Sequence, residues 1–316
     1  MQAAVLNQWG DPGVLHLADI PKPKPSEKQL MIRVFASSVN PVDFKQRKGK
    51  HRFIFGSPFP VVLGYDVCGK VVEVGSLVHR FKVGDWVFGD LDNTYGGALA
   101  EFALGHEQCF ALKPDGISPE EAAGYPLAAL TALQALRDKA GVKPGQTVLI
   151  NGASGGVGHL ALQMAKLMQA NVIAVASGRN EAFISSFNPD QFIDYQRINL
   201  LSLSEKVDVF FDVIGNYSFL KTKRLLKPNG VYVTTLPRPK VFFHKLFQAF
   251  NGGKKVKTLL RKHSAADMDQ IARWIEEKKL RLHIEKVFSL EQTADAHAYA
   301  EKGRTQGKNI IQIGKA

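Results

Sequence analysis

A glycine-rich segment in the middle of the chain has the residue types and spacing of a dinucleotide-binding turn. Ala153, Gly155 and Gly158 match the fingerprint G-x-G-x-x-G, with alanine in place of the first glycine. Glycine at 155 lets the backbone approach a pyrophosphate, and glycine at 158 lets a helix pack closely on the preceding strand. The N–H groups at the start of that helix bind phosphate oxygens. The residues expected to contact the dinucleotide are Ala153, Ser154, Gly155, Gly156, Val157 and Gly158.

The segments on either side of this turn follow the order that such a site requires. Residues 148–151 are predicted to form a short buried strand, and residues 159–168 a helix with an apolar face. Residues 170–177 are apolar and β-branched, which favours a second parallel strand. Strand, turn, helix and strand together predict a nucleotide-binding βαβ unit.

The residues after the second strand indicate which cofactor is bound. An NAD-selective site places Asp or Glu roughly 20 residues after the fingerprint, where it binds the ribose 2′-hydroxyl. This chain has Ser177 and Arg179 there, and a hydroxyl with a guanidinium suits a 2′-phosphate. NADPH is therefore the expected cofactor. The alternative for Arg179 is a solvated loop residue beside Glu181, and Tyr195 either flanks the adenine or phosphate or is a core aromatic at a strand end.

Length and composition indicate a soluble two-domain protein. The chain has 316 residues, of which 45% are hydrophobic and 22% are charged. It has no apolar run of roughly 18 residues or more, so no transmembrane helix is expected. A predicted strand begins at once in residues 1–6, which leaves no room for a targeting segment. Cys68 and Cys109 are too few for a disulfide framework or a four-cysteine zinc lobe, and a reducing cytoplasm is the expected location.

The positive charge of the chain is concentrated in one segment. Residues 213–266 contain twelve Lys or Arg and no Asp or Glu, whereas the remainder has 29 of each sign. Nucleic acid, an anionic membrane surface or an acidic ligand are all possible partners for such a block. A solvated face near an NADPH site is the simpler interpretation, so no nucleic-acid partner is expected and a peripheral membrane contact stays open. Residues 241–250 have a helical apolar face beside lysines, which suits contact with a membrane or a hydrophobic substrate, but their length favours a lid or interface helix.

The pattern of turns and apolar runs changes near residue 118. Before it, short β-type runs are broken by Gly and Pro, which predicts a compact antiparallel barrel. After it, helices are predicted over 119–126, 127–139, 265–279 and 291–301, and strands over 207–214, 230–236, 286–290 and 309–313. The helix at 265 is expected to be capped by Ser264, with Asp267 three residues on.

In the order of its predicted segments and in its motifs, almost the whole chain resembles the zinc-independent quinone oxidoreductase branch of the medium-chain dehydrogenase/reductase superfamily. The matching segments are 38–45 (Ser-Val-Asn-Pro-Val-Asp-Phe-Lys), 64–69 (Gly-Tyr-Asp-Val-Cys-Gly), 83–88, 96–102, 127–132, the fingerprint, 192–195 and 307–310. Within this branch, the run Asn-Pro-Val-Asp-x-Lys is most similar to the alkenal/one and enone oxidoreductases.

The resemblance implies an α/β fold with two domains. A GroES-like β-barrel catalytic domain would comprise residues 1–122 and 283–316, and a Rossmann domain with a doubly wound parallel sheet would comprise residues 123–282. The active site of the family lies in the cleft between the two domains. A homodimer formed through the Rossmann sheet edges is also expected from the resemblance.

The resemblance further implies that the site contains no metal. The zinc-dependent relatives use a Cys and a His at the positions of Asn40 and Tyr65, and residues 127–132 offer no third ligand. His106 and Cys109 have the residue types of a metal pair, but two ligands without partners are more simply structural.

By the same resemblance, Asn40 contacts the nicotinamide ribose region, and Lys45 and Tyr65 are the best proton sources or donors to a substrate oxygen. The alternatives are a surface lysine and an aromatic wall without chemistry. Asp43 either holds Lys45 or caps the helix there. Thr131, Ile214 and Leu236 are assigned to the cofactor site, with Thr131 and Leu236 flanking the nicotinamide.

These residues predict hydride transfer assisted by positioning and hydrogen bonds alone. Hydride from NADPH would add to the β-carbon of an enone or alkenal, or to a quinone, while donors stabilise the negative charge on the carbonyl oxygen. The alternative function is an NADPH-binding scaffold whose basic segment 213–266 binds RNA or an anionic membrane surface.

Overall fold

The chain divides into two compact units in the computed structural model, which describes residues 1–316 except 51, 53–55, 57–58, 237–252 and 315–316. Unit 1 comprises Met1–Leu127 and His263–Ala316, and unit 2 comprises Ala128–Lys262. The helix predicted over 241–250 lies outside the described residues. No helix in the described part of the chain is long and apolar enough to cross a membrane.

Unit 1 consists of two sheets and the helices that cover them. A seven-stranded sheet has the order β15-β16-β3-β5-β6-β8, with β7 also paired to β3, and a three-stranded sheet has the order β2-β1-β4. The pairings are antiparallel except for β15 with β16. The strands are β1 Gln2–Leu6, β2 His16–Asp19, β3 Gln29–Ser38, β4 Val61–Val62, β5 Asp66–Val74, β6 Trp86–Asp90, β7 Phe102–His106, β8 Phe110–Leu112, β15 Ile284–Ser289 and β16 Lys308–Gln312.

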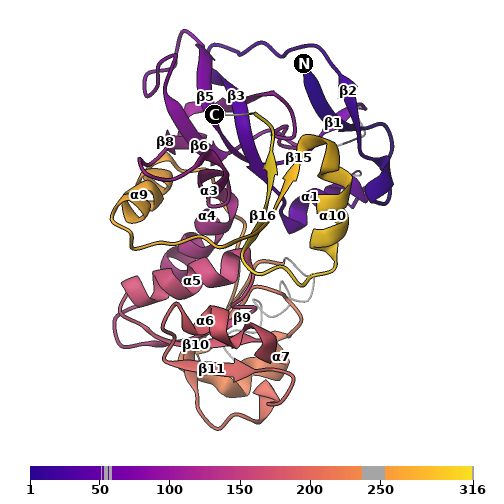
Figure 1. The fold of residues 1–316 in the computed structure, drawn as a ribbon. Helices are drawn as coiled ribbons and strands as arrows, with labels where there is room; N and C mark the ends of the chain where they lie inside the picture. Colours follow the sequence, from indigo (N-terminus) through magenta and orange to yellow (C-terminus); the bar gives the residue numbers. More distant parts are fainter. Residues whose placement is uncertain (51, 53–55, 57–58, 237–252, 315–316) are drawn as a thin grey trace. The chain divides into compact units, whose positions relative to one another are not determined.

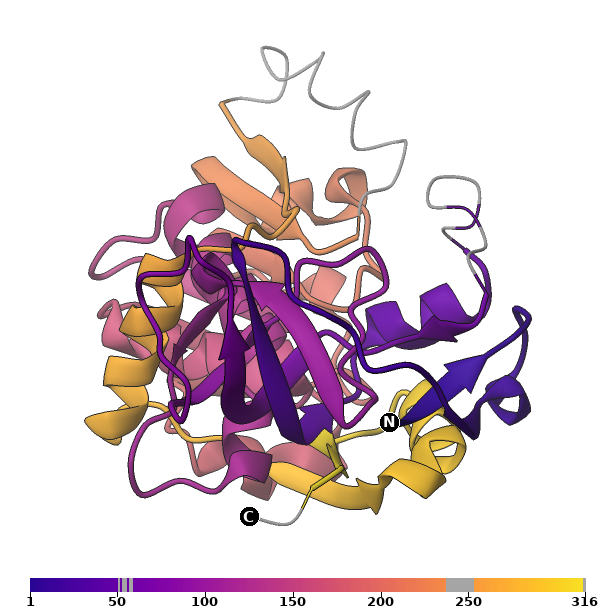
Figure 2. The ribbon, with the colours of Figure 1, turned by 90° about the horizontal axis from the view of Figure 1, so that it is seen from above.

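Helices and short 3-10 turns accompany the sheets of unit 1, whose longest strands are β3 and β5. The helices are α1 Pro41–Arg47, α3 Pro119–Ala123, α9 Ala265–Glu276 and α10 Thr293–Glu301, with 3-10 turns η1 Pro12–Val14, η2 Glu107–Cys109 and η8 Leu290–Gln292. Helices α9 and α10 lie on opposite sides of these strands (Figures 1 and 2). Successive side chains of a strand point to opposite faces, so every second residue of β3 lies on the same face. Leu30, Ile32 and Val34 therefore pack together in one hydrophobic core.

Unit 2 is a parallel six-stranded sheet with the order β11-β10-β9-β12-β13-β14. The strands are β9 Thr147–Asn151, β10 Asn171–Ala176, β11 Gln191–Asp194, β12 Val207–Asp212, β13 Leu226–Thr234 and β14 Lys255–Thr258. The helical segments are η3 Ala135–Ala140, α5 Gly156–Leu167, η4 Gly178–Asn180, α6 Glu181–Ser185, η5 Leu200–Ser202, α7 Phe219–Thr222 and η6 Lys223–Leu225; α4 Pro126–Gln134 begins at the end of unit 1.

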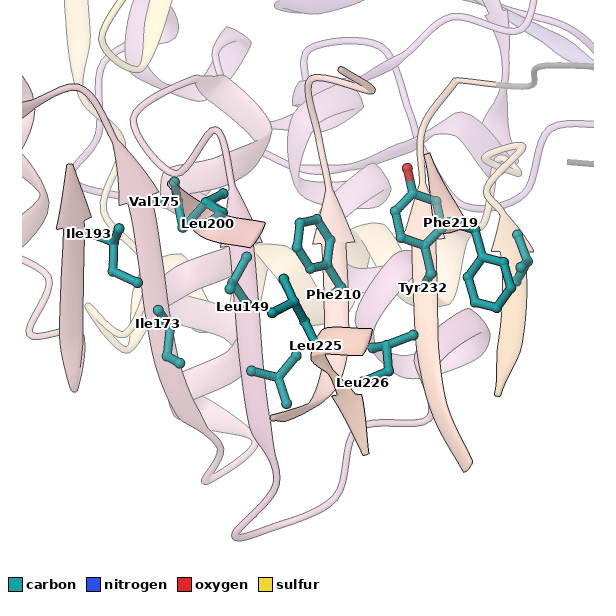
Figure 3. Packing of buried hydrophobic residues seen from close by; sticks show 12 residues of the cluster. Leu149, Ile173, Val175, Ile193, Leu200, Phe210, Phe219, Leu225, Leu226 and Tyr232 are labelled. Carbon is teal, nitrogen blue, oxygen red and sulfur yellow. The ribbon is translucent and has the colours of Figure 1, made fainter. Parts of the chain in front are cut away.

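Both faces of this sheet are buried. On one face, Leu149, Phe210 and Tyr232 of neighbouring strands form a cluster that Phe219 of α7 joins (Figure 3). The intervening residues, such as Ile150, are also fully buried. Helices therefore cover both faces, as a parallel sheet with crossover connections requires.

The predicted elements that fall within the described residues are present, with shifts of a few residues at their ends. Ser264 caps α9 as expected, since its Oγ accepts the N–H of Asp267 at 3.2 Å. Along the chain, the boundaries between the units fall at 127/128 and 262/263. The sequence predicted domain boundaries at 122/123 and 282/283. The largest difference is α9, which the sequence assigned to the Rossmann domain and which packs on β8 of unit 1 (Figure 1).

Candidate active site

The turn between β9 and α5 contains two glycines, Gly152 and Gly158, that no larger residue could replace without movement. Gly152 has φ +90°, a conformation that L residues rarely adopt. A Cβ on Gly158 would lie 2.0 Å from the carbonyl oxygen of Gly152, so helix and strand approach closely there. A Cβ on Gly155 would meet only that same oxygen, at 3.7 Å, so the outer side of the turn is open. The fingerprint prediction missed Gly152, which has the positive φ.

The N-terminus of α5 leaves donors available for an anion. Gly155 is the N-cap and supplies no side-chain hydrogen bond, and the first turn contains no acidic residue. Ser154 borders the turn, and its Oγ accepts the side-chain N–H of Asn180 at 2.8 Å. Uncapped N–H groups, the helix dipole and an open glycine backbone together fit the pyrophosphate of a dinucleotide.

The ends of β10 and β11 carry the residues expected at the 2′-phosphate. Ser177 is buried and its Oγ donates to Oε1 of Gln196 at 2.7 Å, whereas Arg179 is exposed. Tyr195 is 49% exposed, which excludes the alternative of a core aromatic. The carboxylate of Asp194 is near Gly178, and its Oδ1 accepts the N–H of Gln196 at 3.0 Å. A buried hydroxyl, an exposed guanidinium and an exposed aromatic ring therefore occur together at this edge of the sheet.

A buried carboxylate shapes the loop that follows β12. The Oδ1 of Asp212 accepts the side-chain N–H of Asn151 and the backbone N–H of Gly215, both at 2.8 Å. Its Oδ2 accepts the hydroxyl of Tyr232 at 2.8 Å and the N–H of Tyr217 at 3.1 Å. The sequence interpretation overlooked Asn151 and Asp212. The sequence did contain a signal for them, since each is a polar residue at the carboxyl end of a buried parallel strand. The carboxyl ends of parallel strands lie on the same side of the sheet, where ligands bind.

The apolar residues assigned to the cofactor lie in the loops just after the carboxyl ends of two neighbouring strands. Ile214 is 52% exposed and lies against Gly152 of the glycine turn. Leu236 is half-buried, and a Cβ on Gly215 would be 2.5 Å from one of its methyl carbons. Ile214 and Leu236 thus border Gly215 on the loops after β12 and β13. Thr131 is 7% exposed on α4.

In unit 1, Asn40 and Asp43 form the start of α1. The backbone N–H of Asn40 donates to Oδ2 of Asp43 at 2.7 Å, so Asp43 caps the helix, which is one of the two roles that the sequence left open. The side chain of Asn40 is buried, and its Oδ1 accepts Nζ of Lys308 at 2.6 Å.

The two predicted donors differ in their environment. Lys45 is half-buried on α1, and burial, together with the charge of Lys50, lowers the pKa of its ammonium. Tyr65 is buried, and its hydroxyl accepts Nε2 of Gln46 at 2.6 Å and donates to the carbonyl of Thr94 at 2.7 Å. Because a phenol has one hydrogen, this arrangement favours the aromatic wall for Tyr65 and leaves Lys45 as the more available proton source.

Comparison with known proteins places this site in a family. Residues 26–115 match the alcohol dehydrogenase GroES-like domain, and residues 188–311 match the zinc-binding dehydrogenase domain. The chain is 34% identical to the chloroplast envelope quinone oxidoreductase homolog of Arabidopsis thaliana, over 99% of this chain and 98% of that protein. The chain belongs to the quinone oxidoreductase and alkenal/one oxidoreductase branch of the medium-chain dehydrogenase/reductase superfamily.

Two further relatives agree with this membership. The NADPH-dependent alkenal/one oxidoreductase of Arabidopsis thaliana is 34% identical over 98% of this chain and 79% of its own length. The solved quinone oxidoreductase of Coxiella burnetii is 33% identical, covers 99% of both chains and has a TM-score of 0.91. The predicted architecture is therefore confirmed, with a GroES-like domain and a Rossmann domain in a medium-chain oxidoreductase, and its cofactor is a nicotinamide dinucleotide.

Among the residues that the structure describes, no group of three or more His, Cys, Asp or Glu is arranged to hold a metal ion. His106 instead pairs with Asp92, with Nδ1 and Oδ2 2.7 Å apart, and Cys109 is buried.

Proposed function

We propose that this oxidoreductase uses NADPH to reduce the C=C bond of α,β-unsaturated carbonyl compounds, or to reduce quinones. The observation that carries the proposal is the open turn 152–158 followed by Ser177 and Arg179 in place of an acidic residue. The printed names of the relatives, an alkenal/one oxidoreductase and quinone oxidoreductases, support the same acceptors.

The residues described above have separate tasks in this reaction. NADPH, when bound, supplies a hydride to the β-carbon of the acceptor. The N-terminus of α5 would bind the pyrophosphate, Ser177 and Arg179 would bind the 2′-phosphate with Tyr195 beside the adenine, and Ile214, Leu236 and Thr131 would border the nicotinamide. Asn40 would contact the nicotinamide ribose region. Lys45 would donate a hydrogen bond to the carbonyl oxygen as negative charge develops there, and the α-carbon of the resulting enolate would take up a proton from water to give the saturated product.

Arg179→Ala is expected to raise the Kd for NADPH roughly 10- to 100-fold, since a hydrogen bond to a charged group contributes about 1.5–3 kcal/mol. The Kd for NADH should stay nearly unchanged, because NADH lacks the 2′-phosphate. Both constants are measured from nicotinamide fluorescence. Lys143→Ala is the matched control, because it removes an exposed cation from the turn before β9. That turn lies at the amino ends of the strands, away from Arg179. Equal weakening of both cofactors by Arg179→Ala would contradict this role.

If Lys45 acts in its protonated form, enone reduction should slow as the pH rises through its pKa, which burial and Lys50 hold below the ordinary value. Lys45→Met should lower kcat and remove this alkaline decline. Lys50→Met removes the neighbouring charge and should move the decline to higher pH. The measurement is kcat against pH for the wild type and both variants, and an unchanged decline in Lys45→Met would exclude Lys45 as its source.

The function itself is tested by anaerobic NADPH oxidation with a short enone, a long-chain alkenal, a 1,4-benzoquinone and a simple aldehyde, with NADH run in parallel. We expect turnover of the enone, alkenal or quinone and none of the aldehyde. NADPH binding without any turnover would contradict the proposal.

We further propose a homodimer in a reducing, cytoplasmic compartment. β14 is one of the two edge strands of the parallel sheet in the described residues and is suited to pairing with a second copy, and both cysteines are buried and form no disulfide. Size-exclusion chromatography with light scattering tests this, and a monomer would overturn the dimer.

The excess positive charge lies in unit 2, which has 19 Lys or Arg and 7 Asp or Glu, whereas unit 1 has 22 of each sign. The relatives described above do not support the alternative of an RNA-binding scaffold.

A further inference from the structure

The C-terminal strand brings a lysine to the beginning of α1. In the pairing of β16 with β3, Ile310 lies opposite Ser38, and the carbonyl of Asn309 accepts the N–H of Val39 at 3.0 Å. This register places Lys308 beside Asn40. The side chain of Lys308 is only 3% exposed, and its Nζ lies 2.6 Å from Oδ1 of Asn40.

The ammonium of Lys308 shares a buried network with Asp66, which is completely buried. The Oδ2 of Asp66 accepts Nζ of Lys308 at 3.2 Å, Nδ2 of Asn40 at 2.7 Å and Oγ of Ser38 at 2.5 Å. Its Oδ1 accepts the backbone N–H of Leu127 at 2.7 Å. Both charges of the ion pair are thus compensated within unit 1, from four separate segments of the chain.

This network fixes the orientation of the Asn40 amide. A flipped amide would place NH₂ against the ammonium of Lys308 and the oxygen against the carboxylate of Asp66, and both contacts would become repulsive. One amide hydrogen of Asn40 is used by Asp66, which leaves the other for a ligand. A buried ion pair is weak evidence for stability, because an apolar pair of similar volume is often as stable. The network is therefore better explained by the orientation that it imposes on Asn40.

We propose that Lys308 is a positioning residue for hydride transfer, which acts by holding the Asn40 amide through its buried ammonium. The cation that the Asn40 oxygen binds thus belongs to the chain itself. The inference rests on the proposed reductase function and adds to it a residue that does not touch the reacting atoms.

A double-mutant cycle tests whether Lys308 acts through Asn40. Lys308→Met, Asn40→Ala and the variant with both changes are compared in single-turnover hydride transfer from NADPH to an enone, with thermal melting as the measure of folding. Lys308→Met is expected to slow transfer about 30-fold or more, because a small misplacement of a positioning group can cost roughly 100-fold. In the Asn40→Ala background, the same change should have little further effect. Additive losses would overturn the proposal.

Three further variants guard against a purely structural explanation. Lys308→Met combined with Asp66→Asn removes both buried charges, so it should fold better than either single change but still transfer hydride slowly. Lys308→Arg keeps the charge and should recover part of the rate. Lys286→Met makes the same change at an exposed position of the neighbouring strand β15 and should transfer at the wild-type rate. A folded, charge-free variant that transfers within about threefold of the wild type would also overturn the proposal.

Binding of NADPH gives a readout that does not depend on turnover. The fluorescence of the bound nicotinamide should change in Lys308→Met, while the Kd for NADPH, which depends mainly on unit 2, should change much less than the rate. If the wild type transfers no hydride to any acceptor, the proposed function fails. The fluorescence comparison then decides separately whether Lys308 sets the surroundings of the nicotinamide, and an unchanged spectrum would exclude it.

Discussion

Gly158→Ala should destabilise unit 2 and weaken NADPH binding together. The added methyl group would lie 2.0 Å from the carbonyl oxygen of Gly152 and 2.7 Å from Cα of Ala153, and both obstacles are backbone atoms that cannot rotate away. Helix α5 must therefore move off β9. We expect a loss of roughly 3 kcal/mol in the free energy of unfolding, the upper part of the range for overpacked cores. Urea titration of the purified variant measures it.

The same shift displaces the N–H groups at the start of α5. The Kd for NADPH should rise roughly 100-fold, which corresponds to the loss of about two hydrogen bonds to charged phosphate oxygens at about 1.5 kcal/mol each. Gly155→Ala is the matched control. Its methyl group has open space, with its nearest neighbour at 3.7 Å, so folding should be nearly unaffected while the cofactor meets a side chain. Equal stability of the Gly158→Ala variant and the wild type would contradict this account of the turn.

The periodic and motif-rich parts of the chain could be predicted from the sequence because their signals are local. The strand at β9, the turn and α5 lie within one short segment, and each residue type there follows from its own neighbours. The cap of α9 by Ser264 is equally local, with its bond to Asp267 only three residues away. Propensity, periodicity and capping act over such distances, so they are visible without a structure.

The residues that sequence analysis missed depend on contacts between distant segments. Asn151 and Asp212 meet because β9 and β12 are adjacent in the sheet although 61 residues separate them. Asn40 and Lys308 are 268 residues apart and meet through the register of β16 on β3. Lys308 lies in the segment 307–310 that matches the family, but this match does not reveal its contact with Asn40. Strand order and register are properties of the whole fold, so roles of this kind follow only from coordinates.

The domain assignment of α9 shows the same limit in another form. Its capping signal and apolar face predict a helix but do not say which surface the apolar face will cover. The sequence analysis attached it to the preceding Rossmann segments, whereas it packs against β8, and Arg80 of unit 1 binds Asp269 of this helix at 2.8 Å. An apolar helix face shows that the helix packs against something, but the surface that it packs against is known only from the tertiary structure.

Acid should destabilise unit 1 through His297, a fully buried residue of α10. Within the described residues, neither ring nitrogen of His297 has a hydrogen-bond partner. Burial, with a smaller contribution from the charge of Arg47, lowers the pKa of this histidine from 6.5 to about 3. The folded protein therefore keeps the ring neutral over a range of pH in which the unfolded chain takes up a proton.

The sign of the effect follows from this difference in proton binding. Above pH 6.5 neither state is protonated at His297, so its contribution to stability does not depend on pH. Below that value the unfolded state binds the extra proton, and the free energy of unfolding falls by about 1.4 kcal/mol per pH unit until the folded pKa is reached. The loss attributable to His297 should be about 3 kcal/mol at pH 4. It should be visible already between pH 6.5 and 5, where most carboxylates are still ionised.

His297→Met isolates this contribution, because methionine fills the buried site without titrating. The free energy of unfolding from urea titrations should fall less steeply with acid in the variant than in the wild type, and the two curves should diverge below pH 6.5. His79→Gln is the control, because it removes a histidine that is exposed in the folded protein. Parallel curves for the wild type and His297→Met would show that the buried imidazole is not the acid-sensitive group, and that a water or another unseen partner accepts and donates at its ring.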